Sequence, residues 1–439
     1  MKGFRFVHCA DLHLDTPIVG VGELSASLRE RAQKIKEKLT KATLDAFDKI
    51  VNLCLEKNAD FLLVAGDIFE RGQPTLRAQL KFLDGVKRLA NEGIHTYFVC
   101  GNHDPESEWL EYLEFPEEVH RFPSSGVKEF VFEKNGGKPA RIFGISHKNG
   151  AVSENLARLF KEKKKSDRND SFNIGLLHCN VGGRSQEFNY APCALDDLLR
   201  ADIDYWALGH IHKKEVIRTE KPLIIYAGNP QGRKMTETGE RGCYLVAVSN
   251  GGAVEFEFEA TDTIRFVEDE FNIKSIETLD NLDNSLAKKC HETLKSVDGR
   301  SVITRIRLKG ETSLHEELTA SRIRELQDKI NDRYIHSEQF VWLAHLEKET
   351  RPKADIEKLR KSDSFLGDFL NAVAAMKASL KNGGEGARKE LEETAGELYN
   401  DPAFSELLSQ PTDVEIERIL SEVETMGVEK LMPKERERE

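Results

Sequence analysis

Five short apolar runs in the first 215 residues each end in a motif rich in His, Asp or Asn, and this recurrence constrains the fold most. The runs are 4–9, 61–65, 96–100, 172–177 and 205–208, followed by Asp11-Leu12-His13, Gly66-Asp67, Gly101-Asn102-His103-Asp104, His178 and Gly209-His210-Ile211-His212. Continuous apolar runs are typical of strands covered on both faces. Because functional groups of α/β sheets gather at the carboxyl ends of the strands, the motifs predict one polar site.

The segments between the first three runs have the spacing of amphipathic helices. Apolar side chains recur at helical intervals from Leu24 to Asn58 and from Leu76 to Asn91. These segments predict the order strand, helix, strand, helix, strand for the first hundred residues. From Val119 the strands become shorter, and a second sheet is expected to begin there. Its further strands are expected at 172–178, 205–208, 222–226, 241–248 and 253–259.

Changes in the pattern divide the chain into three expected domains: 1–260, an α/β capping domain at 261–350, and a helical acidic region at 351–439. The middle domain has predicted helices at 276–294 and 314–330 and strands at 302–308 and 339–346. The last region has predicted helices at 365–380, 387–399 and 414–424, which pack either on this chain or on a partner. The charged segment 158–170 is expected to be a solvated helix end or, alternatively, a contact for phosphate.

The net charge of −12 does not exclude a nucleic-acid partner, because the acidity is concentrated near the C-terminus. Residues 381–439 carry 8 basic and 16 acidic side chains, which is most of the excess. The seven cysteines form no Cys-x-x-Cys pair, which is typical of reduced thiols. No apolar run is long enough to cross a bilayer, and the first residues lack a signal-peptide pattern. We therefore expect a cytoplasmic protein without membrane association.

The strand-end motifs contain the side chains that two divalent metal ions require. The candidate ligands are Asp11, His13, Asp67, Asn102, His178, His210 and His212. Residues i and i+2 of an extended segment point the same way, so Asp-x-His and His-x-His can each direct two ligands at one cluster. A carboxylate shared between two ions suits phosphoryl chemistry, and the mixed N/O donor set favours manganese, iron or zinc over calcium.

These motifs, in this order, resemble the motif series of calcineurin-like metallophosphoesterases. Three further stretches resemble the SbcD-type DNA-repair exonucleases, and among them the YhaO-like branch: 9–15 (CADLHLD), 66–69 (GDIF) and 226–233 (YAGNPQGR) with 239–242 (GERG). The resemblance implies a four-layer α/β/β/α sandwich of two mixed sheets, with a small α/β cap and a helical C-terminal region. It covers the first 260 residues strongly and the following unit moderately.

The resemblance also implies a role for each residue of the motifs. Asp11, His13, Asp67 and His212 would hold one metal ion, and Asp67, Asn102, His178 and His210 the second. His103 would face the scissile phosphate and either protonate the leaving oxygen or stabilise the charge on it, with Asp104 orienting its imidazole. Gln231, Arg233, Arg305 and Arg307 are candidate substrate contacts. Some members have His where this chain has Glu70, and a negative charge near the phosphodiester is expected to weaken exonuclease positioning, so the balance of exonuclease to endonuclease activity is left open.

By resemblance, the protein would be a Mn²⁺-dependent DNA nuclease. It would act as a 3′-to-5′ exonuclease and an endonuclease in DNA repair, as a homodimer with an SMC-like ATPase of the SbcC type. Two alternatives remain: a metallophosphoesterase acting on a small nucleotide, and a catalytically silent scaffold for the ATPase. The additional domain with Arg305 and Arg307 favours DNA over a small substrate, and the complete ligand set argues against the scaffold.

Overall fold

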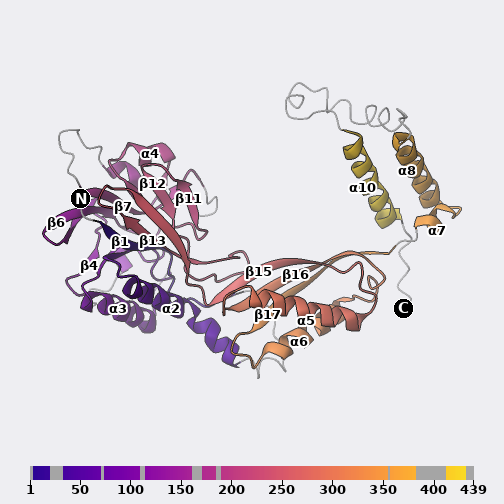
Figure 1. Ribbon diagram of the computed structural model, residues 1–439, viewed down its shortest axis with the longest axis horizontal. Helices are drawn as coiled ribbons and strands as arrows, with labels where there is room; N and C mark the ends of the chain where they lie inside the picture. The colour runs from indigo at the N-terminus through magenta and orange to yellow at the C-terminus, as the bar shows by residue number, and fades with distance from the viewer. Residues whose placement is uncertain are drawn as a thin grey trace. The chain divides into compact units, whose positions relative to one another are not determined.

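The fold is built on two six-stranded sheets that pack face to face (Figure 1). The computed structural model describes residues 3–19, 33–70, 74–108, 114–160, 171–183, 189–353, 356–381 and 412–431.

The first sheet has the strand order β14-β13-β1-β2-β3-β4. Its bounds are β1 Phe4–Cys9, β2 Phe61–Ala65, β3 His95–Val99, β4 Val119–Arg121, β13 Gly242–Val248 and β14 Val254–Ala260. Strands β1 to β4 are parallel, whereas β13 joins β1 antiparallel and β14 joins β13 antiparallel. The sheet is therefore mixed, and its parallel centre carries the first three polar motifs.

The second sheet has the order β11-β12-β10-β7-β6-β5. Its bounds are β5 Lys128–Lys134, β6 Gly137–Ile145, β7 Phe172–His178, β10 Tyr205–Gly209, β11 Glu215–Arg218 and β12 Leu223–Tyr226. Here β6, β7, β10 and β12 are parallel, and the two edge strands are antiparallel. A two-stranded sheet, β8 Asn180–Val181 and β9 Pro192–Cys193, follows β7.

Alternate residues of the central strands face two different cores, which explains why these strands are apolar throughout. One face of each sheet meets the other sheet in a core rich in aromatic rings, among them Phe6, Phe61 and Tyr205. The other face of the first sheet is covered by α2 Gln33–Glu56 and α3 Leu76–Asn91. That of the second is covered by α4 Leu195–Arg200 and η2 Leu156–Leu159. The four-layer α/β/β/α architecture is confirmed.

The region after the sandwich has three strands and two helices. Its bounds are β15 Ile264–Asn272, α5 Leu279–Lys295, β16 Ser301–Thr312, α6 Ala320–Tyr334 and β17 Val341–Pro352. The strands form one sheet in sequence order. Buried residues of β15, β16 and β17, including Phe266, Ile303 and Trp342, share a core with Ile35 from the first turn of α2.

The C-terminal region is helical, as expected. Helix α7 Ile356–Arg360 and helix α8 Phe365–Lys381 are followed by α10 Asp413–Leu431. Helices α8 and α10 pack through small apolar clusters that include Leu370, Val373, Ile416 and Val428. The expected helix at 387–399 lies outside the described residues, as does most of the charged segment 158–170.

The chain divides into two compact units. One comprises Met1–Glu270, Asp283–Arg307 and Ile323–Glu347, and the other comprises Phe271–Leu282, Leu308–Arg322 and Lys348–Glu439. This division runs through the expected capping domain, so the three-domain scheme stays a prediction. Within the described ranges, no helix has the length and hydropathy of a membrane span.

The aromatic core between the sheets predicts a specific loss of stability. Phe61 is fully buried, stacks on Phe6 at a centroid distance of 5.1 Å and contacts the ring of Tyr97 at 5.7 Å. Phe61→Ala is expected to lower the free energy of unfolding by about 3–5 kcal/mol because it leaves a cavity. Leu80→Ala, at a side chain 52% exposed on α3, is the control and should change it by less than about 0.5 kcal/mol. Denaturant titration of both variants measures the difference, and equal values would contradict the description of this core.

Candidate metal centre

The loops after β1, β2, β3, β7 and β10 meet at one end of the sandwich. Beyond the ends of their strands, the first two loops continue side by side, with Asp11 N donating to Gly66 O at 3.0 Å and His13 N to Asp67 O at 3.0 Å. A Cβ on Gly66 would lie 2.8 Å from Cγ of His178, and one on Gly209 would overlap the carbonyl of Ala65. Glycine at these two positions therefore lets the two sheets approach closely enough to share a site.

Four of the seven predicted ligands have a backbone conformation that residues other than glycine rarely adopt. The φ angles are 51° at Asp11, 41° at His13, 51° at Asp67 and 99° at His210. Such residues cost on the order of 1–3 kcal/mol each and concentrate at functional sites. All four of these residues belong to the motifs that the sequence analysis selected.

One group of candidate ligands combines Asp11, His13 and His212. The Nε2 atoms of the two imidazoles lie 3.2 Å apart, and His13 Nε2 lies 3.9 Å from Oδ2 of Asp67. Asp11 is also fixed from behind, because both of its carboxylate oxygens accept from the backbone N–H of His210, at 3.0 and 3.2 Å. Three potential donors and Asp67 thus converge on one point.

A second group combines Asp67, Asn102, His178 and His210. Oδ1 of Asn102 lies 3.0 Å from Nε2 of His178 and 3.2 Å from Nδ1 of His210. Nε2 of His178 is 3.4 Å from Oδ2 of Asp67. Asp67 therefore lies between the two groups, which is the position that a shared carboxylate requires. The structure brings all seven predicted ligands together.

The donor atoms of these groups suit a transition-metal ion. Nδ1 of His178 contacts the carbonyl oxygen of Ala65 at 2.8 Å, and Nδ1 of His212 contacts a carboxylate oxygen of Glu237 at 2.8 Å. A proton on Nδ1 leaves the Nε2 lone pair free for a metal, which is the usual arrangement of ligating histidines. Burial lowers the pKa of His13 to about 3, so this imidazole is neutral. A neutral imidazole facing buried carboxylates is a good fit to a divalent cation.

Charge within the cluster is balanced internally. Burial raises the pKa of Asp11. For Asp67, burial acts in the same direction but the neighbouring His178 outweighs it, so the pKa of Asp67 falls well below its usual range. Burial would lower the pKa of His178, but the charge and hydrogen bond of Asp67, with smaller effects of Asp11 and the Ala65 carbonyl, together raise it to about 9. Bound cations would take over this compensation of the two buried carboxylates.

Asp104 has a different local role from the predicted one. Its carboxylate accepts three backbone N–H bonds, from Gly101 at 2.8 Å, Ile68 at 2.9 Å and Asp67 at 3.1 Å. It therefore ties the loop after β3 to the loop after β2. The carboxylate in contact with Nδ1 of His103 is that of Glu70. The correction arises because a neighbour in sequence, Asp104, folds back onto the backbone.

Glu70 also contacts two other charged or titratable groups. Its Oε2 lies 3.2 Å from Nδ1 of His13 and accepts from Nη1 of Arg233 at 2.7 Å. Burial disfavours a charged His103, but the adjacent Glu70 and Asp67 prevail and raise the pKa of its imidazole. Arg233 and His103 both face this carboxylate, and the effect of Glu70 on exonuclease and endonuclease activity stays a prediction.

The four candidate substrate contacts are already engaged in the protein. Gln231 has no exposed surface; its side chain donates to the Ile264 carbonyl at 2.7 Å and accepts from Thr263 N at 2.8 Å. In this conformation it joins a loop to β15 and has no surface for a substrate. Arg233 pairs with Glu70, as described above.

Arg305 and Arg307 lie on one face of β16, as their alternation predicts. Arg305 is within 3.2 Å of Glu347 and within 2.6 Å of Glu268, and Arg307 is within 3.2 and 3.6 Å of the same carboxylates. Their contact with DNA stays a prediction, and these two carboxylates would have to yield to a phosphate.

Sequence reasoning missed Glu237. This residue is buried beneath His212, in the loop between β12 and β13, and belongs to no strand-end motif. The only signal was its place between two motifs of that loop, 226–233 and 239–242.

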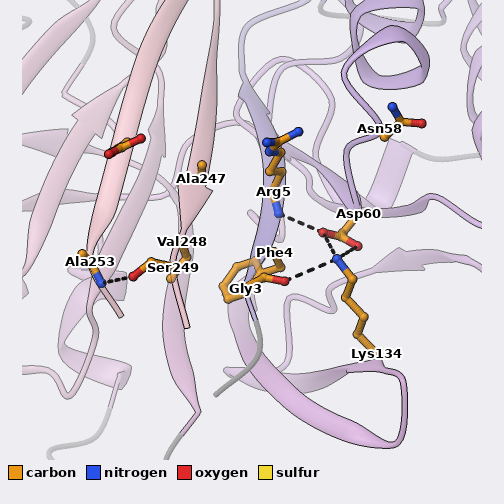
Figure 2. A pocket seen from close by; sticks show the side chains of 11 residues that line it. Gly3, Phe4, Arg5, Asn58, Asp60, Lys134, Ala247, Val248, Ser249 and Ala253 are labelled. Carbon is orange, nitrogen blue, oxygen red and sulfur yellow. Dashed lines mark hydrogen bonds and ion pairs between the residues drawn. The ribbon is translucent and has the colours of Figure 1, made fainter. Parts of the chain in front are cut away.

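A hollow at the opposite end of β1 provides a contrast with the cluster (Figure 2). Its volume is about 430 Å³, and Gly3, Phe4, Asp60, Lys134 and Val248 are among the residues that line it. Lys134 pairs with Asp60 at 2.8 Å and donates to the carbonyl of Gly3 at 3.3 Å. The hollow lies at the amino end of the strand. Its lysine, Lys134, is already bound by Asp60 and the carbonyl of Gly3.

Comparison with known proteins agrees with the geometry. The model of the calcineurin-like phosphoesterase family matches residues 4–214, and that of the YhaO metallophosphoesterase middle domain matches residues 266–351. The chain is 33% identical over 378 residues to the uncharacterized metallophosphoesterase YhaO of Bacillus subtilis, a match that covers 85% of this chain and 88% of that protein.

Two named nucleic-acid proteins are more distant relatives. The SbcD component of the nuclease SbcCD of Bacillus subtilis is 24% identical over 264 residues, which covers 54% of this chain and 63% of that one. The DNA double-strand break repair protein Mre11 of Sulfurisphaera tokodaii is 25% identical over 239 residues, which covers 52% and 54%. Since it matches both family models and has a relative of 33% identity along most of its length, the chain belongs to the calcineurin-like phosphoesterases, in their YhaO-like branch.

Proposed function

We propose that the protein is a Mn²⁺-dependent nuclease that hydrolyses phosphodiester bonds of DNA. The observation that carries the proposal is the position of Asp67, whose Oδ2 lies 3.9 Å from Nε2 of His13 in one ligand group and 3.4 Å from Nε2 of His178 in the other, with His103 beside them. Asp11, His13, Asp67 and His212 would hold one ion, and Asp67, Asn102, His178 and His210 the other. When bound, two such ions neutralise phosphate oxygens and lower the pKa of an attacking water.

His103 is the proposed proton donor to the leaving oxygen. Its Nδ1 contacts Glu70, so Nε2 is the nitrogen left for the substrate. Its side chain is 30% exposed, and the adjacent carboxylates raise the pKa of its imidazole against the effect of burial, which favours the protonated form that a proton donor needs. The backbone N–H of His103 donates to Oδ1 of Asp67 at 2.9 Å, which fixes the donor relative to the cluster. Proton transfer from a group placed in this way typically contributes 10²–10⁴-fold to a rate, by rough estimate.

DNA is the preferred substrate for two reasons. The relatives with named functions include a component of a nuclease and a DNA double-strand break repair protein. A small nucleotide, the alternative substrate, would not need the middle domain matched at 266–351. The silent-scaffold alternative is opposed by the presence of all seven ligands. We further propose 3′-to-5′ exonuclease action with endonuclease action in DNA repair, in the cytoplasm and as a homodimer.

The C-terminal helices are the proposed docking site for an SMC-like ATPase of the SbcC type. Several large apolar side chains on α8 and α10 are exposed: Phe365, Val423, Met426 and Leu431. The name of the SbcCD relative describes one member of a two-part nuclease.

A labelled linear DNA duplex tests the substrate directly. Purified protein with Mn²⁺ is expected to release nucleotides from the duplex, and a chelator should abolish the release. Release of label from the 3′ end first would support the proposed polarity. Cleavage of a chromogenic phosphodiester without release from DNA would instead favour the small-nucleotide alternative.

The contact between Glu70 and His103 predicts two graded losses. His103→Ala is expected to lower the cleavage rate by about 10²–10⁴-fold while both Mn²⁺ ions still bind. Glu70→Gln keeps the shape but weakens the hold on the imidazole, so a loss of about 10–100-fold is expected. Rates and Mn²⁺ binding are measured on the same samples. Loss of a metal ion in the His103 variant would contradict its assigned role.

The tail makes a separate prediction. Phe365→Glu and Met426→Glu replace apolar side chains that are 74% and 51% exposed, so the helices should still fold. Each variant is expected to lose co-purification with the SbcC-type ATPase of the same source while keeping its nuclease activity on DNA. Truncation after Lys381 should have the same effect, and unchanged co-purification of all three would overturn the docking site.

A further inference from the structure

The loop between β12 and β13, residues 227–241, contacts both the backbone and the imidazole of His212. The carbonyl oxygen of His212 accepts from the backbone N–H of Asn229 at 3.0 Å and from Nη1 of Arg241. Nδ1 of its imidazole contacts Oε1 of Glu237 at 2.8 Å. Both the backbone and the ring of one candidate ligand are therefore fixed by a single loop.

Glu237 is itself firmly held. Its residue is 4% exposed, and Oε2 accepts from Arg233 N at 2.7 Å and from Nδ2 of Asn229 at 3.0 Å. Burial would favour the protonated acid, but His212 and Arg233 outweigh this effect and hold the pKa of Glu237 well below its usual range. A buried carboxylate with both oxygens engaged has little freedom to move. The position of the carboxylate therefore restricts the orientation of the imidazole.

We propose that Glu237 is a positioning residue of the metal centre, which orients His212 through Nδ1 so that Nε2 faces the ion shared with Asp11 and His13. This inference rests on the proposed metal-dependent function. A carboxylate on the far nitrogen fixes the tautomer and ring angle of a ligating imidazole and increases its basicity.

Arg233 extends this arrangement to the opposite ligand of the same ion. Its backbone N–H donates to Glu237, and its guanidinium donates to Glu70, which also contacts His13 and His103. The two carboxylates behind His13 and His212 are thus joined by one residue. In the second group, Nδ1 of His178 contacts the backbone carbonyl of Ala65 at 2.8 Å. The contact of Glu237 with His212 therefore bears on the ion that His212 would hold.

Direct measurement of Mn²⁺ binding to the full-length protein tests the inference without relying on activity. The wild type is expected to bind two ions by calorimetry, with the number of bound ions confirmed by electron paramagnetic resonance of free Mn²⁺. Glu237→Gln is expected to weaken one of the two sites by about 10–100-fold and leave the other unchanged.

Two backgrounds assign the weakened site. Asn102→Ala removes a ligand of the second group, so the remaining site depends on His212, and adding Glu237→Gln should weaken it. His13→Ala leaves the second group, and there Glu237→Gln should have no effect. The matched control is Glu240→Gln, at a carboxylate of the same loop that pairs with Lys214 at 3.1 Å instead of the cluster. It should bind Mn²⁺ as the wild type does.

The outcomes separate this inference from the proposed function. Unchanged affinity in Glu237→Gln, or an equal loss in both backgrounds, overturns the positioning role. Glu237→Asp keeps the charge and should lose less affinity than the Gln variant. If thermal melting without metal shows that the Gln variant is unfolded, the Asp variant carries the same test. Two bound Mn²⁺ ions without cleavage of DNA would overturn the proposed function and leave the positioning of His212 intact. Binding of no Mn²⁺ by the wild type would overturn both.

Discussion

Close approach of two sheets at the carboxyl ends of their strands is the constraint on which the site depends. Asp11, Asp67 and Asn102 come from one sheet, and His178, His210 and His212 come from the other. No single loop contains a complete set of ligands. The bare backbones of Gly66 and Gly209 allow the approach, and the aromatic core behind them sets the spacing of the sheets. The chemistry is thus a property of the sandwich as a whole.

The residues that form the site are unfavourable for the stability of the folded chain. The cluster buries two aspartates, Asp11 and Asp67, among imidazoles. These two residues and two of the histidines have left-handed backbone conformations. Both features are unfavourable in the folded chain by itself. Cations bound to the native state and not to the unfolded chain would offset these costs through binding free energy. Folding and metal loading are therefore expected to be linked, with the surrounding hydrogen bonds of Asp104 holding the loops in register meanwhile.

The sequence was informative wherever function follows the strand periodicity. All seven ligands stand at the ends of apolar runs, and α3 has the predicted bounds of Leu76 to Asn91. It was less informative where side chains meet across long separations. Asp104 stands beside His103 in sequence, yet Glu70, 33 positions earlier, provides the carboxylate. Gln231 was a candidate substrate contact, but its side chain is buried and bonds to a strand that begins 33 positions later. Such contacts depend on loop conformation, for which residue spacing carries no signal.

The hydrogen bonds of Gln231 have a consequence for how this protein could be recombined. Its side chain joins the loop that surrounds His212 to Thr263 and Ile264, at the start of the middle region. Met235 of the same loop shares a core with Phe266 and Trp342. The two-sheet sandwich therefore has no boundary after β14 that is free of side-chain contacts to the following region. A chimera that exchanged everything beyond residue 260 for the corresponding part of a relative would retain every ligand and still lose the support for one of them. The loop and the middle region are best transplanted as a single unit.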